Sequence, residues 1–525
     1  MTNRPSLALA ALAFVLLAAL PAAAKTVKWS FQGDIATLDP YAHALSFTGN
    51  FLHHIYEPLV RRDRKLGFEP ALATKWELRE PNVWRFTLRG NVKFHEGQPF
   101  NADDVVVSLN RIMHPDSRAR GYVQAISEVR KVDDRTVDIV TKGPYPLLLN
   151  DLSGVFIMSA KWMKDHNAER PGSITTKVTT YASTNANGTG PFKLESYRPD
   201  QLTVLVVNKE WWDKPQHNLT RVEFRPIAAD ATRVAALLSG EIDLMIPATL
   251  QDIPRINSTP GFRVLELPSV RTIFFGMNQK DDELKGSNVK GKNPLKDVRV
   301  RRALWLGINS DQLTQKVMRG KARTAGIIAA PAIPGYDAAL DQRPAHDVNA
   351  ARKLLAEAGY PDGFAVNLSC PNDRYVNDED ICVAVTAMWA RIGVKANLVT
   401  ESASTYFPKI DRGEADIFMY GYATLPTMDG FSIVTAQLSS RKEGRGQNNF
   451  GGYSNARIEE IARDARTELD QKKRLALVSE ALKISKDEVA YIPLHQQPIP
   501  WAVRQGVEVP QFVDEYLRLW FMQVR

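Results

Sequence analysis

The sequence predicts an α/β protein with two lobes, and two observations carry that prediction. Helical segments alternate with short apolar strands through most of the chain, and such alternation is typical of sheets whose strands run substantially parallel. One helix–strand unit also occurs twice, at residues 234–245 and 406–419. In each copy a glycine (Gly240, Gly413) ends the helix, and an apolar strand begins two or three residues later. We interpret the two copies as equivalent elements of two α/β lobes.

The first part of the chain predicts strands around one well-marked helix. Four segments alternate apolar and polar residues as half-buried strands do: residues 76–78, 84–88, 136–140 and 202–207. Asn101 is expected to cap a helix, because its side chain can accept a backbone N–H at the helix start. Val105, Leu109 and Ile112 then recur at helical spacing on one face.

The later part of the chain repeats the helix–strand alternation. Asp347 is expected to cap a helix that carries residues 351–358, and the strand 364–366 follows it. A second helix at 381–391 precedes a strand at 394–399. Ligands of such sheets gather in a crevice at the strand ends. No long linker or low-complexity tract separates the units.

The first 24 residues have the pattern of a secretory signal peptide. Arg4 precedes the apolar run Leu7–Leu20, and small residues ending at Ala24 follow it. The run is shorter than the roughly 20 apolar residues of a membrane-spanning helix, which disfavours the alternative of an uncleaved anchor. Cleavage after Ala24 would leave Lys25 at the new N-terminus, with no nearby cysteine for a lipid anchor. We expect an exported, soluble protein.

The chain has two cysteines, Cys370 and Cys382. This number excludes a disulfide-stapled scaffold and any four-thiolate metal site. In an oxidising compartment the two could pair and close a short loop. Cys382 also falls within an apolar helical pattern, so a buried free thiol is an equal alternative.

Composition and motifs provide no evidence of an enzyme. The net charge of +8 over 525 residues is too weak to indicate nucleic-acid binding. Residues 286–292 have the glycine and lysine spacing of a phosphate loop, but Asn293 replaces the required Ser or Thr, so a solvated loop is favoured. No G-x-S-x-G elbow or H-E-x-x-H motif occurs. The sequence therefore predicts no catalytic residue, no metal and no cofactor.

A set of short segments, in order, covers nearly the whole chain after residue 24 and resembles one family. The segments are residues 37–40 (TLDP), 55–60 (IYEPLV), 70–73 (PALA), 92–97 (VKFHEG), 100–105 (FNADDV), 188–192 (GTGPF), 208–212 (NKEWW), 297–304 (DVRVRRAL) and 491–494 (YIPL). Together they are similar to the periplasmic solute-binding proteins of ABC importers that take up peptides, nickel complexes and related solutes (family 5).

The resemblance implies a two-lobed clamshell, the type II periplasmic-binding-protein fold, with an extra domain in the first lobe. The implied units are a signal peptide at 1–24; lobe I at 25–66, 188–269 and 501–525; an additional domain at 67–187; and lobe II at 270–500. The chain would cross between the lobes near 271–275 and near 500–503, and these crossings would form the hinge.

The resemblance also implies where the solute binds. In peptide-binding relatives an aspartate soon after a Gly-Trp pair holds the peptide ammonium, but Leu425 stands at that place here. Asp429 would replace it only if the loop is shifted, and a turn aspartate before Gly430 is an equal alternative. Arg374 lies where relatives hold a ligand carboxylate, a task that suits its planar fork; a surface arginine is the alternative.

The remaining candidate residues are aromatic or amide side chains. Phe47, Tyr375 and Tyr422 are candidate walls of the cleft, because aromatics offer flat area with few rotors; ordinary core packing is the alternative. Asn448 and Asn449 lie in a polar, glycine-rich loop, where they could bind ligand amides or cap their own turn.

These residues lead to one main hypothesis and two alternatives. The main one is a periplasmic, monomeric binding protein that captures a small peptide-like or other polar solute and delivers it to an ABC permease in the inner membrane. A secreted hydrolase of similar solutes is the first alternative, although it would need a nucleophile–base pair or a metal site. An exported, chaperone-like binder of unfolded chains is the second.

Overall fold

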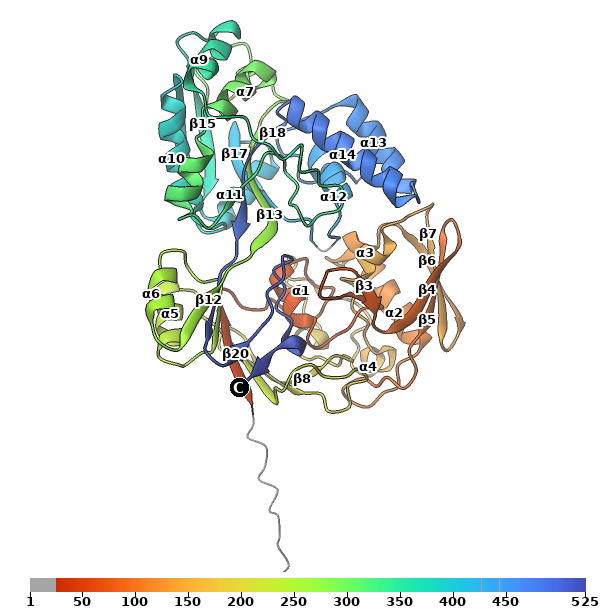
Figure 1. Cartoon of the computed structure of the whole chain (residues 1–525). Coiled ribbons are helices and arrows are strands. Elements are labelled where there is room, and N and C mark those ends of the chain that lie inside the picture. The colour runs from red at the N-terminus through yellow and green to blue at the C-terminus, as the bar shows by residue number, and fades with distance from the viewer. Residues whose placement is uncertain (1–24, 426, 443) are drawn as a thin grey trace, which may run out of the picture.

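A computed structural model describes residues 25–425, 427–442 and 444–525 of the chain (Figure 1). The predicted signal peptide, residues 1–24, lies outside the described residues. Within the described part, no helix has the length and apolar character needed to cross a membrane.

A seven-stranded sheet forms the base of the molecule, and we call the part built on it lobe I (Figure 1). The strand order is β12-β19-β11-β1-β10-β9-β8. The strands are β1 (Thr26–Phe31), β8 (Phe192–Arg198), β9 (Leu202–Val207), β10 (Arg221–Pro226), β11 (Leu244–Ile246), β12 (Phe262–Leu265) and β19 (Trp501–Arg504). Its helices are α1 (Ser46–Leu52), α5 (Asp230–Leu238), α6 (Ile253–Ser258) and η6 (Leu519–Phe521), and a small ribbon joins β20 (Val507–Glu508) to β21 (Gln523–Val524).

A six-stranded sheet forms the upper part in Figure 1, and we call the part built on it lobe II. Its order is β14-β18-β13-β17-β15-β16. The strands are β13 (Pro268–Met277), β14 (Arg323–Thr324), β15 (Phe364–Pro371), β16 (Val394–Glu401), β17 (Ile417–Tyr422) and β18 (Tyr491–Pro498). The helices are η3 (Pro294–Lys296), α7 (Val298–Leu306), α8 (Ser310–Gln312), η4 (Leu313–Val317), α9 (Val348–Glu357), α10 (Asp378–Ala390), α11 (Ala403–Asp411), α12 (Phe431–Ile433), η5 (Val434–Leu438), α13 (Ala456–Thr467) and α14 (Gln471–Asp487).

The additional domain lies beside lobe I and is built on the antiparallel sheet β4-β5-β7-β6 (Figure 1). Its elements are β4 (Ala73–Glu80), β5 (Val83–Leu88), α2 (Ala102–Met113), η1 (Arg120–Val123), β6 (Ile126–Asp133), β7 (Thr136–Thr141), α3 (Leu148–Leu152), α4 (Ala160–Asp165) and η2 (Tyr181–Ser183). The ribbon β2 (Val60–Arg62) and β3 (Phe68–Pro70) leads into it. One hydrophobic cluster runs from Trp29 of lobe I to Leu109 of α2, so the domain shares its core with lobe I.

Local sequence signals explain where the main helices begin and end. The Asn101 side chain accepts the backbone N–H of Asp103, and Asp104 accepts the N–H of Asn101, which completes a capping box on α2. After α5 and α11, Gly240 and Gly413 adopt left-handed φ values of 80° and 72°, which glycine tolerates without steric cost. The repeated unit is therefore confirmed: α5–β11 serves lobe I and α11–β17 serves lobe II.

The expectation of substantially parallel sheets is wrong in one respect. Only β10 and β11 run parallel to β1, and only β16 and β17 run parallel to β15. The other pairs within these two sheets are antiparallel. Parallel pairing needs a crossover connection, and strands joined by a short turn or entering directly from the other lobe do not have one.

Two short segments join the lobes. The chain leaves β12 at Leu265 and enters β13 at Pro268, and it returns from β18 at Pro498 to β19 at Trp501. The crossings predicted at 271–275 and 500–503 are therefore displaced, because most of those residues are already paired within β13 and β19. The main hydrophobic cluster of lobe II surrounds Phe275 and Trp389 and also includes Leu250 and Ile253 of lobe I. Two short connections between two sheets are the kind of segment at which a hinge can lie.

Candidate functional site: the cavity between the lobes

A cavity of about 740 Å³ lies between the two lobes. Lobe I contributes the end of β1, helix α1, the loop after β11 and the C-terminal segment 514–517. Lobe II contributes residues 372–380 and Leu425, and the hinge strands contribute Arg271 and Gln497. The cavity thus has walls from both lobes.

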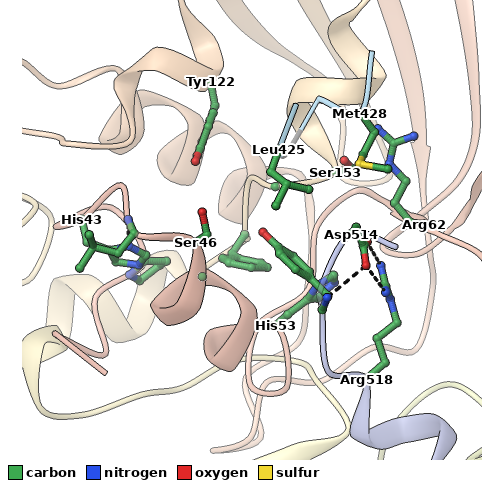
Figure 2. A pocket seen from close by; sticks show the side chains of 16 residues that line it. His43, Ser46, His53, Arg62, Tyr122, Ser153, Leu425, Met428, Asp514 and Arg518 are labelled. Carbon is green, nitrogen blue, oxygen red and sulfur yellow. Dashed lines mark hydrogen bonds and ion pairs between the residues drawn. The ribbon is translucent and has the colours of Figure 1, made fainter. Parts of the chain in front are cut away.

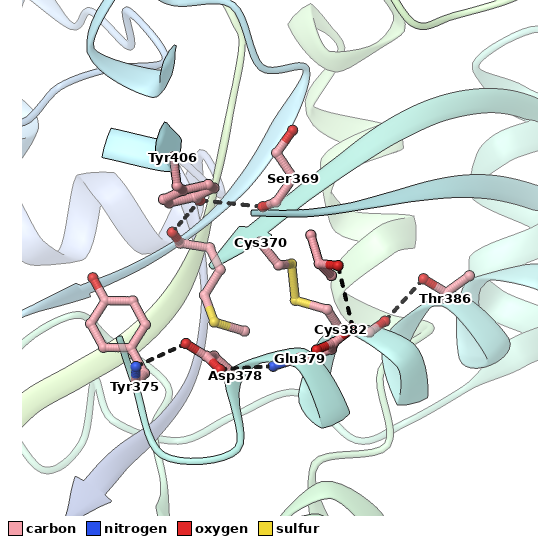
Figure 3. The surroundings of a disulfide bond; sticks show 10 residues. Ser369, Cys370, Tyr375, Asp378, Glu379, Cys382, Thr386 and Tyr406 are labelled. Carbon is pink, nitrogen blue, oxygen red and sulfur yellow. Dashed lines mark hydrogen bonds between the residues drawn. A yellow bond between two sulfur atoms is a disulfide. The ribbon is translucent and has the colours of Figure 1, made fainter. Parts of the chain in front are cut away.

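The loop that carries Arg374 is fixed at several points. A disulfide joins Cys370 of β15 to Cys382 of α10 (Figure 3), which decides between the two alternatives for these cysteines. The Asp378 carboxylate accepts the backbone N–H groups of Arg374 (3.0 Å) and Tyr375 (2.9 Å). The disulfide and these bonds hold the Arg374 backbone in place before any solute arrives.

The Arg374 guanidinium has no carboxylate within ion-pair distance among the described residues. It lies 5.1 Å from the centre of the Tyr375 ring. Its side chain meets the water of the cavity while protein surrounds it from both lobes. This partial removal from bulk water, together with the positive charge of Arg271, lowers the pKa of Arg374. A guanidinium without a carboxylate partner has N–H donors free for charge-assisted hydrogen bonds.

Arg271 and Glu515 lie on the same cavity wall and fall outside the sequence-based prediction of site residues. Arg271 donates through Nη1 to the Gly421 carbonyl (3.1 Å), and its Nη2 lies 3.5 Å from Glu515 Oε2. Arg271 belongs to β13, the strand by which the chain enters lobe II, whereas Glu515 reaches the cavity from the C-terminal tail. No local pattern in the sequence places these two residues together.

The predicted aromatic walls divide into two groups. Phe47 and Tyr375 line the cavity, and Phe47 stacks on Phe31 with ring centres 3.9 Å apart. Tyr422 is not among the lining residues; it packs in a cluster within lobe II, and its hydroxyl donates to the Ser432 carbonyl. The sequence pattern cannot distinguish an aromatic residue that lines the cavity from one that packs inside lobe II, because the same residue types serve both roles.

Leu425 lies at the edge of the cavity, where it also borders a second, smaller pocket of about 40 Å³ (Figure 2). The pocket contains the buried rings of His43 and His53, and burial lowers the pKa of both imidazoles. Asp514 is occupied by a buried ion pair with Arg518 (2.6 Å), drawn as dashed lines in Figure 2. At the position expected to face a solute, lobe II therefore presents an apolar side chain.

Asp429 does not line the cavity, which corrects the sequence-based expectation for it. It is 2% exposed, and its carboxylate binds Arg474 of α14 through two bonds of 2.8 and 2.9 Å. It also accepts the backbone N–H of Phe431 (2.9 Å). These partners use the carboxylate for the internal structure of lobe II.

Asn448 and Asn449 also lie outside the residues that line the cavity. Asn449 is buried: its amide donates to the carbonyls of Ser439 and Tyr453 and accepts the Tyr453 N–H. The Asn448 backbone N–H donates to the Ala436 carbonyl. These contacts favour the alternative in which the two residues organise their own turn.

The lobes also touch at the rim of the cavity, through a contact that we call the latch. The carbonyl of Thr427 in lobe II accepts Nη2 of Arg62 (2.8 Å) and Nδ2 of Asn150 (2.6 Å). Arg62 belongs to β2 and Asn150 to α3, so both donors lie in lobe I or its additional domain. In the described structure, a single carbonyl of lobe II therefore accepts two hydrogen bonds from the opposite side of the cavity rim.

Residues 67–444, more than half of the chain, match the family model "Bacterial extracellular solute-binding proteins, family 5 Middle". The chain belongs to this family. The family 5 fold with two lobes is confirmed, and so is the solute-binding role in an ABC transporter over the hydrolase alternative.

Relatives of this family 5 protein cover almost its whole length. It is 28% identical over 517 residues to the dipeptide-binding protein of Escherichia coli strain K12, with 92% of each chain covered. It is 27% identical over 498 residues to heme-binding protein A of Haemophilus influenzae, with 88% of this chain and 86% of that one covered. The solved structure of HbpA2 from Haemophilus parasuis superposes with a TM-score of 0.80 at 24% identity, over 95% of this chain and all of that one.

Proposed function

We propose that this family 5 protein captures a small, peptide-like solute with an anionic group in the periplasm and delivers it to an ABC permease in the inner membrane. The unpaired guanidinium of Arg374 in the cavity between the lobes carries this proposal. The name of the Escherichia coli relative, a dipeptide-binding protein, supports the peptide-like class.

Enclosure gives the anion contact its weight. A polar solute that enters a closing cavity loses water, so each of its charges needs a partner in the protein. Arg374 offers up to two parallel N–H bonds to a carboxylate, and Phe47 and Tyr375 offer apolar area to the rest of the solute. Binding energy that exists only in the closed state shifts the lobes toward closure, and the closed form is the signal that a permease reads.

The same proposal assigns the protein no catalysis and a monomeric state with one solute per chain. It also places the mature protein in the periplasm, after removal of residues 1–24. Leu425 distinguishes the cavity from one that holds a peptide ammonium through an aspartate of lobe II, so an ordinary dipeptide would lack that contact.

Native mass spectrometry of protein purified without denaturation, followed by titration calorimetry, tests the proposal. We expect one small anionic molecule per chain and a tenfold or greater loss of affinity in Arg374→Ala, since a charge-assisted pair is removed. Arg412→Ala, which removes an exposed arginine of lobe II outside the cavity, is the matched control. Equal affinity in both variants would contradict the role of Arg374, and chemical turnover of the bound solute would contradict a binding protein.

A further inference from the structure

Glu515 is held in a fixed position on the lobe I side of the cavity. Its backbone adopts a left-handed φ of 66°, a conformation that is uncommon for a residue with a side chain. Its N–H donates to the Phe512 carbonyl, and the neighbouring Val513 carbonyl accepts the N–H of Val270 in β13. The buried Asp514–Arg518 pair anchors the other side of the turn. The C-terminal tail is therefore built to hold residue 515 at the cavity wall.

The carboxylate of Glu515 is incompletely satisfied. Its side chain is 18% exposed, and its one ion-pair partner among the described residues, Arg271, lies at 3.5 Å. Charge-assisted hydrogen bonds are typically 2.7–2.9 Å long, so this pair is loose. Within the described part of the chain, Oε1 of Glu515 is buried and has no hydrogen-bond partner. A buried carboxylate oxygen without a donor costs free energy, so the present contacts leave acceptor capacity on Glu515 unused.

The charges of the cavity are arranged in a complementary way. Arg374 of lobe II is an unpaired cation, while Glu515 of lobe I is an anion with spare acceptor capacity. Other acids of the lining already accept hydrogen bonds from the protein: Asp378 from Arg374 and Tyr375, and Asp373 from Ala403. Arg374 and Glu515 thus face the cavity with incomplete pairing inside the described part of the protein.

We propose that Glu515 is the acceptor for a cationic group of the solute, so that the cavity selects guests carrying a positive group as well as the anion bound by Arg374. This inference rests on the proposed function, because it assumes that Arg374 binds the solute anion. Closure would then bring the two charges of one guest into contact with both lobes. A solute that lacks either charge would leave one of these two groups without that partner.

Calorimetry with charge-matched probes tests the role of Glu515. The probes are free peptides of two to four residues and the same peptides N-acetylated, which keeps the carboxylate and removes the ammonium. We expect Glu515→Gln to weaken binding of the free peptides roughly 10- to 100-fold and to leave the N-acetylated forms within about twofold. Glu515→Asp keeps the charge and tolerates the left-handed backbone, so it is expected to restore part of the affinity.

The matched control is Glu241→Gln, which removes one negative charge from an exposed position of lobe I outside the cavity lining. An equal loss of affinity in this variant would show that the effect comes from the net charge of the protein and not from Glu515 itself, and it would overturn the inference. Equal losses for free and N-acetylated peptides in Glu515→Gln would also overturn it, because Glu515 would then act only on Arg271. If wild-type protein bound the N-acetylated forms better, the inference would fail while the proposed function stood. Binding of no peptide in either form would instead contradict the peptide-like function, and the inference with it.

Discussion

Two arginines of lobe II, Arg474 and Arg374, occupy opposite kinds of surroundings. Arg474 lies on α14 with 4% of its side chain exposed, and both of its terminal nitrogens bind the Asp429 carboxylate. Arg374 lies in the cavity wall, and no carboxylate of the described residues pairs with it. A charge that the fold has already paired contributes to stability, whereas a charge left unpaired in a cavity is available to a ligand. Changes at the two sites should therefore affect different measurements.

The largest expected effect is on stability, in the interior pair. Asp429→Ala should lower the free energy of unfolding by about 3–5 kcal/mol, because it leaves the Arg474 guanidinium buried without a partner. Arg374→Ala should change that free energy by less than about 0.5 kcal/mol, since it removes no internal bond. Urea denaturation of both variants at pH 7 measures the difference. Similar losses in the two would contradict the distinction between the sites.

The disulfide should affect both properties, because it closes the loop that contains Arg374. Its cysteines are 12 residues apart, and a cross-link over such a loop stabilises by about 3 kcal/mol. The double variant Cys370→Ser/Cys382→Ser should lose that stability and also bind an anionic solute more weakly. Calorimetry and thermal unfolding, each with and without a thiol reductant on wild-type protein, measure the two effects. Unchanged affinity would show that the bonds to Asp378 suffice to hold Arg374.

Local signals in the sequence were enough to predict many elements of both lobes. Asn101 and Asp347 cap the helices that the apolar spacing indicates, and the glycines at 240 and 413 end the two repeated helices as expected. These features depend on residues a few positions apart, so a single sequence contains them. Arg374 was indicated by family resemblance, and the described structure places it in the cavity.

Pairings between distant segments could not be predicted in the same way. Asp429 pairs with Arg474, which lies 45 residues further along the chain on α14. No local sequence pattern distinguishes such an internal pair from a position in the cavity. Glu515 reaches the cavity because the C-terminal tail returns beside β13. The sequence shows which charges exist, but only the tertiary structure shows which of them are already paired.

Glu57 extends the comparison to a buried charge in lobe I. Its carboxylate accepts hydrogen bonds from Trp211, Trp212 and Thr189, and burial, opposed by these bonds and by Arg61, raises its pKa to about 7. Between the unfolded value of 4.5 and about 7, the folded state therefore holds more protons than the unfolded state. Glu57 should thus make the protein lose about 2 kcal/mol of stability as the pH rises from 5 to 7.

Denaturation curves of Glu57→Gln at several pH values test this sign. The variant can differ from wild type by a constant free energy of unfolding at every pH. The slope of its free energy of unfolding against pH, between pH 5 and 7, should be more positive than that of wild type. Glu241→Gln, at an exposed position, should keep the wild-type slope. A wild-type slope in Glu57→Gln would mean that the carboxyl is ionised throughout this range.

The smallest expected effect concerns the latch, which tests whether contacts outside the cavity also contribute to closure. Asn150→Ala removes one of the two donors to the Thr427 carbonyl and leaves Arg62 in place. One such bond contributes about 1 kcal/mol, which corresponds to roughly fivefold in affinity if it exists only in the closed state. Solute binding should weaken by that factor, while the free protein becomes more extended in small-angle scattering.

The latch can be separated from ordinary stability of the additional domain. Asn185→Ala removes an exposed amide that bonds within that domain, and it should change neither affinity nor scattering. If Asn150→Ala lowered affinity without altering the scattering of the free protein, the contact would form only after the solute has closed the lobes. If neither quantity changed, the hydrogen bond from Asn150 would contribute nothing measurable to closure, and other contacts between the lobes, such as the packing of Leu147 in the lobe II cluster, would have to supply it.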